Sequence, residues 1–329
     1  MPKDPFQREI DYLRISVIDR CNLRCVYCMP LRGLSFVPGP ELLTCAEIVT
    51  VVKAAAGLGF RKVRLTGGEP TLRADLLDIV SGIAGVEGIG DVGMTTNALL
   101  LPEMASALVG AGLKRINIHI DSLHPERLKR VMRFGHLDAM LAGLHAAEAA
   151  GLRPIKINCV VVRDYNDPDV VEMARLTIER EWHVRFIELM PLGGGTCAQL
   201  SLSQFVPSAE SRRRIEASLG PLTPLPGGHP SDESRNYRLD GARGVVGFIS
   251  PVSEPYCGAC NRMRLTADGK FHLCLLHDDE LDVKKALRNG GGVDDVRRIL
   301  LEAVSMKPTG HDLDKGVSTE VRSMFQIGG

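Results

Sequence analysis

Residues 19–28 read DRCNLRCVYC and place Cys21, Cys25 and Cys28 within one short stretch. The preceding run, residues 13–18, is apolar and predicts a strand, so the cysteines occupy the loop at its C-terminal end. Cysteine thiolates at such spacings bind iron–sulfur clusters, whereas a structural zinc ion prefers four ligands. No fourth cysteine follows nearby, so one iron of a four-iron cluster stays open for a small ligand. The loop therefore predicts a reactive cluster rather than a structural metal site.

Around this loop the chain alternates between two patterns. Short apolar runs predict strands at 13–18, 62–65, 92–94, 115–120, 155–162 and 184–189. Amphipathic stretches between them predict helices at 47–58, 72–83, 104–111, 139–149 and 170–179. Strand–helix repetition indicates parallel βαβ units. We expect an α/β fold with a partial (β/α)6 barrel of the TIM type, whose working residues lie at the C-terminal strand ends; a doubly wound sheet is the alternative.

The alternation of predicted strands and helices ends after Pro191, where glycines at 193–195 and a proline-containing segment at 221–230 interrupt it. Beyond this point the sequence predicts helices at 208–219 and 293–302 and extended pieces at 245–249 and 261–266. We therefore expect a barrel over residues 1–195 and a smaller C-terminal module over residues 196–329.

Composition narrows the class of protein. The 329 residues carry a formal net charge of zero, which disfavours a nucleic-acid partner. The first residues are polar, so no signal peptide is expected, and no apolar run is long enough to predict a membrane span. Nine cysteines in such a chain indicate metal or redox chemistry in a reducing compartment. We expect a cytoplasmic protein.

The second predicted strand leads into TGGEP at residues 66–70. Two glycines at a strand end allow the backbone to approach a ligand closely, although a plain connection is the usual meaning of such a turn. Arg64 lies inside the strand, and in a barrel it can point into the interior, where a guanidinium needs an anion; on an outward face it is merely solvated.

A second set of three cysteines follows the pattern C-x2-C-x13-C at Cys257, Cys260 and Cys274. This set fits a second cluster with an open iron, or zinc completed by His272 or His277. Between the cysteines, Arg262 and Arg264 share one face of an extended segment. Their rigid forks of donors suit a phosphate group or a carbonyl edge, and the alternative is a pair of solvated arginines.

Taken together, these motifs resemble the radical S-adenosylmethionine (SAM) enzymes and, within them, the GTP 3′,8-cyclase (MoaA) family of molybdenum cofactor biosynthesis. The resemblance covers nearly the whole chain and includes TTN at 95–97, FIELMP at 186–191, CGACNRMRLT at 257–266 and the final Gly328 and Gly329.

The resemblance implies an enzyme of the lyase class with two [4Fe-4S] clusters and SAM as cofactors. It assigns Cys21, Cys25 and Cys28 to the cluster that binds SAM, and Cys257, Cys260 and Cys274 to the second cluster. It assigns Tyr27, Gly68 and Met190 to SAM, and Arg14, Arg64, Thr95, Lys156, Arg262 and Arg264 to GTP. Arg262 and Arg264 would also assist catalysis. His119 stands where the family usually has a serine that helps to bind SAM, and we carry this contact over to His119.

The implied reaction converts GTP to (8S)-3′,8-cyclo-7,8-dihydroguanosine 5′-triphosphate, with the glycine tail entering the active site. The implied partners are a downstream cyclic pyranopterin monophosphate synthase of the MoaC type and a reductant such as flavodoxin or ferredoxin, and a homodimer is compatible with the family. Two other functions stay open: a peptide-modifying radical SAM enzyme with an auxiliary cluster, and a metal-binding protein without catalysis.

Overall fold

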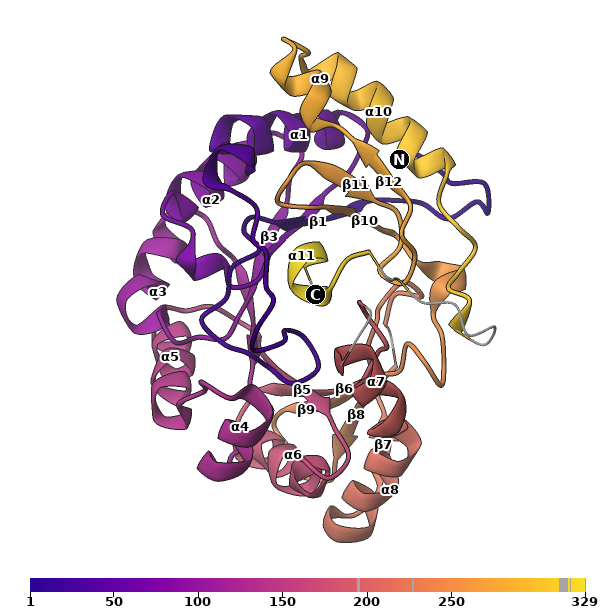
Figure 1. The fold of residues 1–329 in the computed structure, drawn as a ribbon. Helices are drawn as coiled ribbons and strands as arrows, with labels where there is room; N and C mark the ends of the chain where they lie inside the picture. Colours follow the sequence, from indigo (N-terminus) through magenta and orange to yellow (C-terminus); the bar gives the residue numbers. More distant parts are fainter. Residues whose placement is uncertain (194–195, 227, 314–318, 320, 329) are drawn as a thin grey trace.

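A computed structural model describes residues 1–193, 196–226, 228–313, 319 and 321–328. Its centre is a run of six parallel strands that follow one another in chain order (Figure 1). They are β1 (Tyr12–Ser16), β2 (Lys62–Thr66), β3 (Asp91–Thr96), β4 (Arg115–His119), β5 (Ile155–Val161) and β6 (His183–Glu188). A doubly wound sheet reverses its strand order at a switch point, and this sheet does not. The predicted (β/α)6 core is therefore confirmed, and the doubly wound alternative is wrong.

Helices cover the outer face of these strands (Figure 1). They are α1 (Cys45–Gly57), α2 (Leu76–Ala84), α3 (Leu101–Gly110), α4 (Pro125–Met132), α5 (Leu137–Ala149) and α6 (Val170–Glu179). Short 3-10 turns occur at η1 (Gly39–Glu41), η2 (Pro70–Leu72), η3 (Asp167–Asp169) and η4 (Cys257–Ala259). Alternation along each strand sends Leu13 and Ile15 of β1 into the apolar layer under the helices, while Arg14 between them lines the interior.

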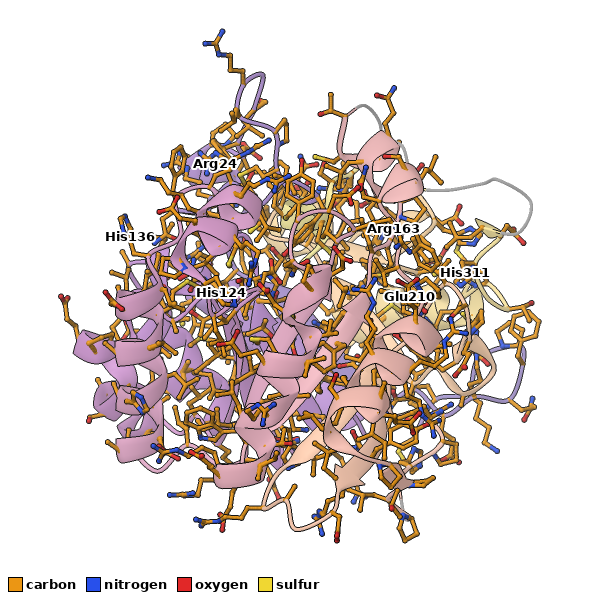
Figure 2. The ribbon with its side chains drawn as sticks, turned by 90° about the horizontal axis from the view of Figure 1, so that it is seen from below. Arg24, His124, His136, Arg163, Glu210 and His311 are labelled. Carbon is orange, nitrogen blue, oxygen red and sulfur yellow. The ribbon has the colours of Figure 1, made fainter. Side chains whose placement is uncertain are left out.

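The C-terminal part extends the same sheet at both of its edges. It comprises α7 (Thr196–Ser203), α8 (Ser208–Leu219), β7 (Leu222–Pro224), β8 (Arg235–Leu239), β9 (Val245–Ile249), β10 (Arg262–Leu265), β11 (Lys270–His272), β12 (Glu280–Asp282), α9 (Lys284–Arg288), α10 (Val293–Ser305) and α11 (Met324–Ile327). Strand β9 pairs in parallel with β6, and β10 pairs in parallel with β1. An ion pair between Arg163 and Glu210 fastens α8 to the end of β5 (Figure 2).

The short helix α11 lies inside the ring of strands and not in the outer layer of helices (Figure 1). In the described part of the chain, no helix combines the length and the apolar character that crossing a membrane requires.

Candidate functional site

The first cysteine loop follows β1 and is partly closed off from water. Cys25 is buried, and Cys21 and Cys28 are half-buried. Burial raises the pKa of Cys21 to about 11 and the pKa of Cys25 well above its usual value. Thiolates are therefore unfavourable here unless a metal cation compensates for their lost hydration. The chemistry of these three donors fits an iron–sulfur cluster.

The TGGEP turn after β2 packs directly against this loop. A Cβ atom at Gly68 would lie 2.2 Å from the carbonyl oxygen of Arg20, so only glycine fits. The amide of Gly68 donates to the Ile18 carbonyl at 2.6 Å, and the amide of Glu69 donates to the Arg20 carbonyl at 2.8 Å. Gly68 thus borders the cysteine loop, and its contact with SAM stays a prediction.

Glu69 connects three neighbouring strand ends, a role that the sequence did not reveal although the residue belongs to the quoted motif. Its buried carboxylate accepts hydrogen bonds from the hydroxyl groups of Thr71 and Thr96, both at 2.6 Å, and from the amide of Asn97 at 2.8 Å. Burial raises the pKa of Glu69, although these donors oppose the shift. The Asn97 side chain then donates to Asn22 of the cysteine loop at 2.7 Å. The turn and the loop therefore form one hydrogen-bonded unit.

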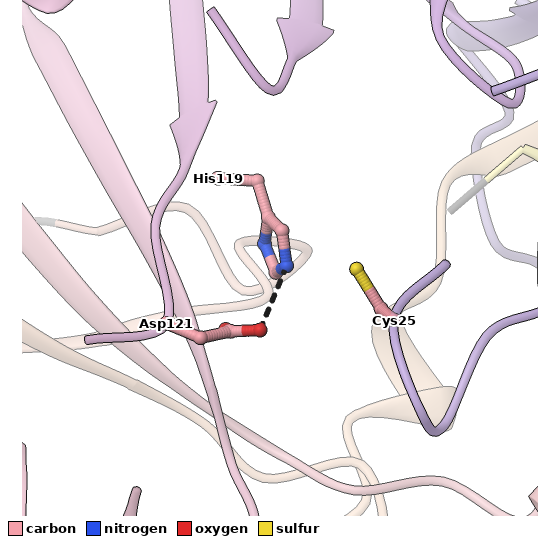
Figure 3. Close-up of side chains that lie close together, drawn as sticks. All are labelled: Cys25, His119 and Asp121. Atoms are coloured by element: carbon pink, nitrogen blue, oxygen red, sulfur yellow. Dashed lines mark ion pairs between the residues drawn. The ribbon is translucent and has the colours of Figure 1, made fainter. Parts of the chain in front are cut away.

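His119 and Tyr27, both predicted to contact SAM, lie together at the end of β4. The Tyr27 hydroxyl is 2.5 Å from Nε2 of His119 and donates to Oδ2 of Asp121 at 2.7 Å. The His119 ring also pairs with Asp121 at 3.2 Å, and Cys25 faces this pair (Figure 3). Burial lowers the pKa of His119, but the neighbouring Asp121 outweighs it and the net shift is upward.

The atoms of Cys25, His119 and Asp121 lie within 4.8 Å of one another, close enough for a single metal ion. Asp121 already accepts from the amide of Val160 through Oδ1 and from Tyr27 through Oδ2. Its carboxylate is therefore occupied within the protein. We interpret His119 and Asp121 as hydrogen-bonded side chains beside the cysteine loop, and not as ligands of a single metal ion.

The second cysteine set lines a cavity together with Arg262, Arg264 and Lys307. Cys257 begins η4, Cys260 directly follows it, and Cys274 comes shortly after β11. Burial raises the pKa of Cys260, but Lys307 and Arg262 outweigh it, so the net shift is downward. Lys307 is itself buried and donates to the carbonyls of Arg262 and Leu273. The buried cations therefore favour the anionic form of Cys260, which suits metal binding, whereas burial raises the pKa of Cys274.

The histidines proposed as zinc ligands have other contacts. His272 is fully buried with Nδ1 3.1 Å from Oε1 of Glu280, and Nε2 of His277 lies 2.9 Å from the Gly310 carbonyl. Among the described residues, only Cys25, His119 and Asp121 bring three ligand atoms within 4.8 Å of one another. The second cysteine set and either histidine therefore do not place three ligand atoms close enough together to hold a single zinc ion.

Most of the residues assigned to GTP lie in the barrel interior. Register pairs Arg14 with Arg64 on one side and with Arg264 on the other. A second cavity is lined by Arg64, Lys156 and Arg262 among others. Thr95 on β3 has a buried hydroxyl without a hydrogen-bond partner among the described residues. Met190, assigned to SAM, lines the cavity beside the second cysteine set instead.

Charge is crowded in this interior. Burial, followed by the neighbouring Arg185 and Arg64, lowers the pKa of Lys156 to about 8. Burial also lowers the pKa of Arg185 to about 10. Within the described chain, Nε of Arg14, Nη1 of Arg64 and both Nε and Nη1 of Arg262 are buried without hydrogen-bond partners. Buried donors of this kind usually have acceptors, so the arrangement indicates an anionic ligand.

Sequence reasoning missed Arg115, Arg185 and Glu233, which line the same cavity. Arg185 could have been found, because it interrupts an apolar strand as Arg64 does. Glu233 comes from the segment between β7 and β8, and nothing in its local sequence marks it.

Gly328, near the C-terminal end, reaches this interior. The carbonyl of Gly328 accepts from Nη1 of Arg264 at 2.6 Å, and a Cβ atom there would lie 2.6 Å from Cγ2 of Thr66. The last residue of the predicted glycine pair, Gly329, lies outside the described residues, as do Gly194 and Gly195 at the predicted module boundary.

Comparisons with known proteins agree with this geometry. Residues 15–177 match the model of the radical SAM superfamily, and residues 182–313 match the family described as Molybdenum Cofactor Synthesis C. The chain is 47% identical to a protein named GTP 3′,8-cyclase from Pelotomaculum thermopropionicum, with 99% of this chain and 100% of that protein covered. It is 43% identical to another of that name from Moorella thermoacetica, with the same coverage.

Among solved structures, the crystal structure of Streptococcus suis SuiB bound to the precursor peptide SuiA is similar in fold. The TM-score is 0.62 at 15% identity, with 92% of this chain and 66% of that chain covered. The full-length identity to the curated relatives is decisive: this chain belongs to the GTP 3′,8-cyclase (MoaA) family of the radical SAM superfamily.

Proposed function

We propose that this chain is a GTP 3′,8-cyclase, which converts GTP to (8S)-3′,8-cyclo-7,8-dihydroguanosine 5′-triphosphate in molybdenum cofactor biosynthesis. The observation that carries the proposal is the set of buried, unpartnered guanidinium N–H groups of Arg14, Arg64 and Arg262 within the described interior. A triphosphate supplies the acceptors that these groups need, in a geometry that guanidinium binds well. The two full-length relatives named GTP 3′,8-cyclase support the same substrate.

Family membership implies SAM and one [4Fe-4S] cluster, and we propose two such clusters. The first would be held by Cys21, Cys25 and Cys28, and the second by Cys257, Cys260 and Cys274. When bound, the first cluster and SAM supply a 5′-deoxyadenosyl radical. The buried thiols of the first set and the cations around the second set support both assignments.

The side chains have a positioning task, because the reaction removes hydrogen from C3′ of the ribose and joins that carbon to C8 of guanine. We propose that Arg14, Arg64 and Lys156 bind GTP chiefly through its triphosphate and that Thr95 also contacts GTP. Arg262 and Arg264 would bind GTP beside the second cysteine set and assist the closing step. Tyr27, Gly68, His119 and Met190 would hold SAM. Fixing the reacting atoms within contact distance provides much of the rate enhancement in such reactions.

We propose that residues 1–195 form the radical-generating part and residues 196–329 the part that holds the base. The two cysteine sets fall on either side of this division, which supports it. A MoaC-type synthase would take the product, flavodoxin or ferredoxin would supply electrons, and a homodimer and a cytoplasmic location stay predictions.

Anaerobic reconstitution tests the proposal. The parent chain should bind about eight irons and cleave SAM only when GTP is present, with formation of the cyclised triphosphate. Replacing the first three cysteines by alanine should leave about four irons and abolish SAM cleavage. Replacing Cys257, Cys260 and Cys274 should also leave about four irons, keep SAM cleavage and abolish the cyclised product.

Two results would contradict the proposal. Zinc instead of iron at the second cysteine set would remove the second cluster. SAM cleavage that is indifferent to GTP but stimulated by a peptide would favour a peptide-modifying enzyme.

A further inference from the structure

The carboxylate of Glu233 lies among the arginines of the interior. Glu233 belongs to the described segment 228–234 between β7 and β8, and its carboxylate reaches three arginines from three different strands. It lies 3.6 Å from Arg14 of β1, 3.7 Å from Arg185 of β6 and 3.3 Å from Arg262 of β10. Its side chain is 20% exposed, and it lines both the cationic cavity and the cavity of the second cysteine set. The carboxylate therefore occupies the junction of the two cavities.

This carboxylate balances only part of the local charge. All ion pairs that Arg14, Arg185 and Arg262 make within the described residues end on Glu233. Even so, Nε of Arg14 and both Nε and Nη1 of Arg262 have no acceptor there. Burial raises the pKa of Glu233, but Arg262 and Arg14 outweigh it and hold that pKa well below its usual range. One carboxylate thus faces three guanidinium groups, two of which keep donors without an acceptor among the described residues.

The segment is also suited to movement. It joins β7 and β8, which form an antiparallel pair at the outer edge of the sheet rather than part of the parallel core. Its turn is held locally, with the amide of His229 donating to Asp232 at 2.9 Å and the amide of Asp232 donating to the His229 carbonyl at 2.8 Å. Among the described residues, a hydrogen bond from Nη2 of Arg262 to the Ser231 carbonyl at 2.8 Å also ties the segment to the interior. Withdrawal of the segment would break no strand pairing of the parallel core.

We propose that Glu233 takes the place of a substrate phosphate. Before substrate binds, its carboxylate pairs with the guanidinium groups of Arg14, Arg185 and Arg262, and a polyphosphate displaces it when it binds. The inference rests on the proposed function, because it takes GTP as the ligand. Carboxylate and phosphate compete for the same guanidinium geometry, and placing both there would bring like charges together. A triphosphate carries several charges and replaces one carboxylate favourably, whereas an uncharged nucleoside cannot.

The test compares Glu233→Gln with the parent holoenzyme under anaerobic conditions. Dissociation constants are measured by equilibrium dialysis for GTP and for inorganic tripolyphosphate. We expect Glu233→Gln to bind both ligands roughly tenfold more tightly, because the competing charge is gone. Asp240→Asn is the matched control, since it removes one negative charge from an exposed position just after β8, and it should bind both ligands as the parent does.

Unchanged affinity of Glu233→Gln for both ligands overturns the inference. Weaker GTP binding with unchanged tripolyphosphate binding also overturns it, because Glu233 would then hold the base. A parent that binds tripolyphosphate but not GTP contradicts the proposed function, while tighter tripolyphosphate binding by the variant still supports displacement.

A measurement on the parent alone guards against a variant that does not fold. Amide hydrogen exchange of residues 228–234 should accelerate when tripolyphosphate saturates the holoenzyme, since the segment loses its anchor. Exchange that is unchanged or slower there overturns the inference.

Discussion

At Gly68 the chain has no room for a side chain, and this decides how the cysteine loop is held. The neighbours of a Cβ atom at this position are backbone atoms of Arg20 and Asp19, which cannot rotate away as a side chain can. The amide of Gly68 is also fixed on the Ile18 carbonyl. Any substituent therefore has to push the turn and the loop apart.

We predict that Gly68→Ala lowers the stability by about 1–3 kcal/mol, the usual cost of overpacking. Displacing the loop should also reduce iron binding at the first cysteine set while the second set keeps its iron. Thermal unfolding of the otherwise intact chain measures the first effect. Iron analysis compares Gly68→Ala in the full chain with Gly68→Ala in a chain that lacks Cys257, Cys260 and Cys274, so that the iron of the two sets is told apart. Gly90→Ala is the control, since a Cβ atom there meets nothing within 4 Å. Full iron content in Gly68→Ala would contradict the argument.

At the scale of elements, the order of the barrel could be predicted because each strand and helix carries its own hydrophobic period. The helix α8 has the predicted bounds, 208–219, whereas the helix expected at 72–83 begins only at Leu76 because Pro70 starts a 3-10 turn. The sequence did not predict α4, whose exposed residues outnumber its buried ones, or the short strands β7 and β8, which form the outermost antiparallel pair of the sheet. Edge strands are partly exposed and lack a clear alternation.

In the candidate site, too, some residues could be predicted from local sequence patterns and others depend on long-range strand pairing. The cysteines, Gly68 and Arg64 stand in motifs that local sequence reveals. The position of Glu233 depends on β8 pairing with β9 and β9 with β6, a long-range arrangement that no local pattern encodes. The hydrogen bonds of Glu69 likewise depend on where β3 ends.

The N-terminal segment before β1 acts as a clamp on the second cysteine loop. Arg8 donates to the carbonyls of Cys257 and Thr309, both at 2.7 Å, and of Pro308 at 2.6 Å. Its guanidinium also pairs with Asp4, whose side chain is fully buried. Three chain segments that are distant in sequence therefore meet at one guanidinium group.

We predict that Arg8→Met costs about 3–5 kcal/mol, because it leaves the buried Asp4 unpaired. Iron content should fall from about eight to about four per chain, as the second cluster loses its support. Lys3→Met breaks an exposed pair with Glu9 instead, which should cost about 0–1 kcal/mol and no iron. If Arg8→Met keeps all its iron, the clamp does not support the second site.

At the scale of the whole molecule, the fold places positively charged side chains in its centre and surrounds them with strands. Strands β9 and β10 flank the parallel core, and α11 places the Gly328 carbonyl on Arg264 inside the ring (Figure 1). Without an anionic ligand, this centre opposes any further positive charge. The stability of the whole chain should therefore depend on pH through groups that line the cationic cavity.

His183, at the start of β6, reports this effect most directly. Burial, followed by Lys156 and Arg185, lowers its pKa to about 4, against an ordinary value of 6.5. Between these pH values the unfolded chain takes up a proton that the folded chain refuses, so stability falls as pH drops through this window. We predict that His183→Asn removes this contribution. The melting temperature of the variant, relative to that of the parent, should therefore rise as the pH is lowered from 7.5 to 5.5. His136→Asn is the matched control, because it makes the same substitution at an exposed position outside the cationic cavity (Figure 2). A constant difference between His183→Asn and the parent across this range would mean that His183 does not sense the cationic centre.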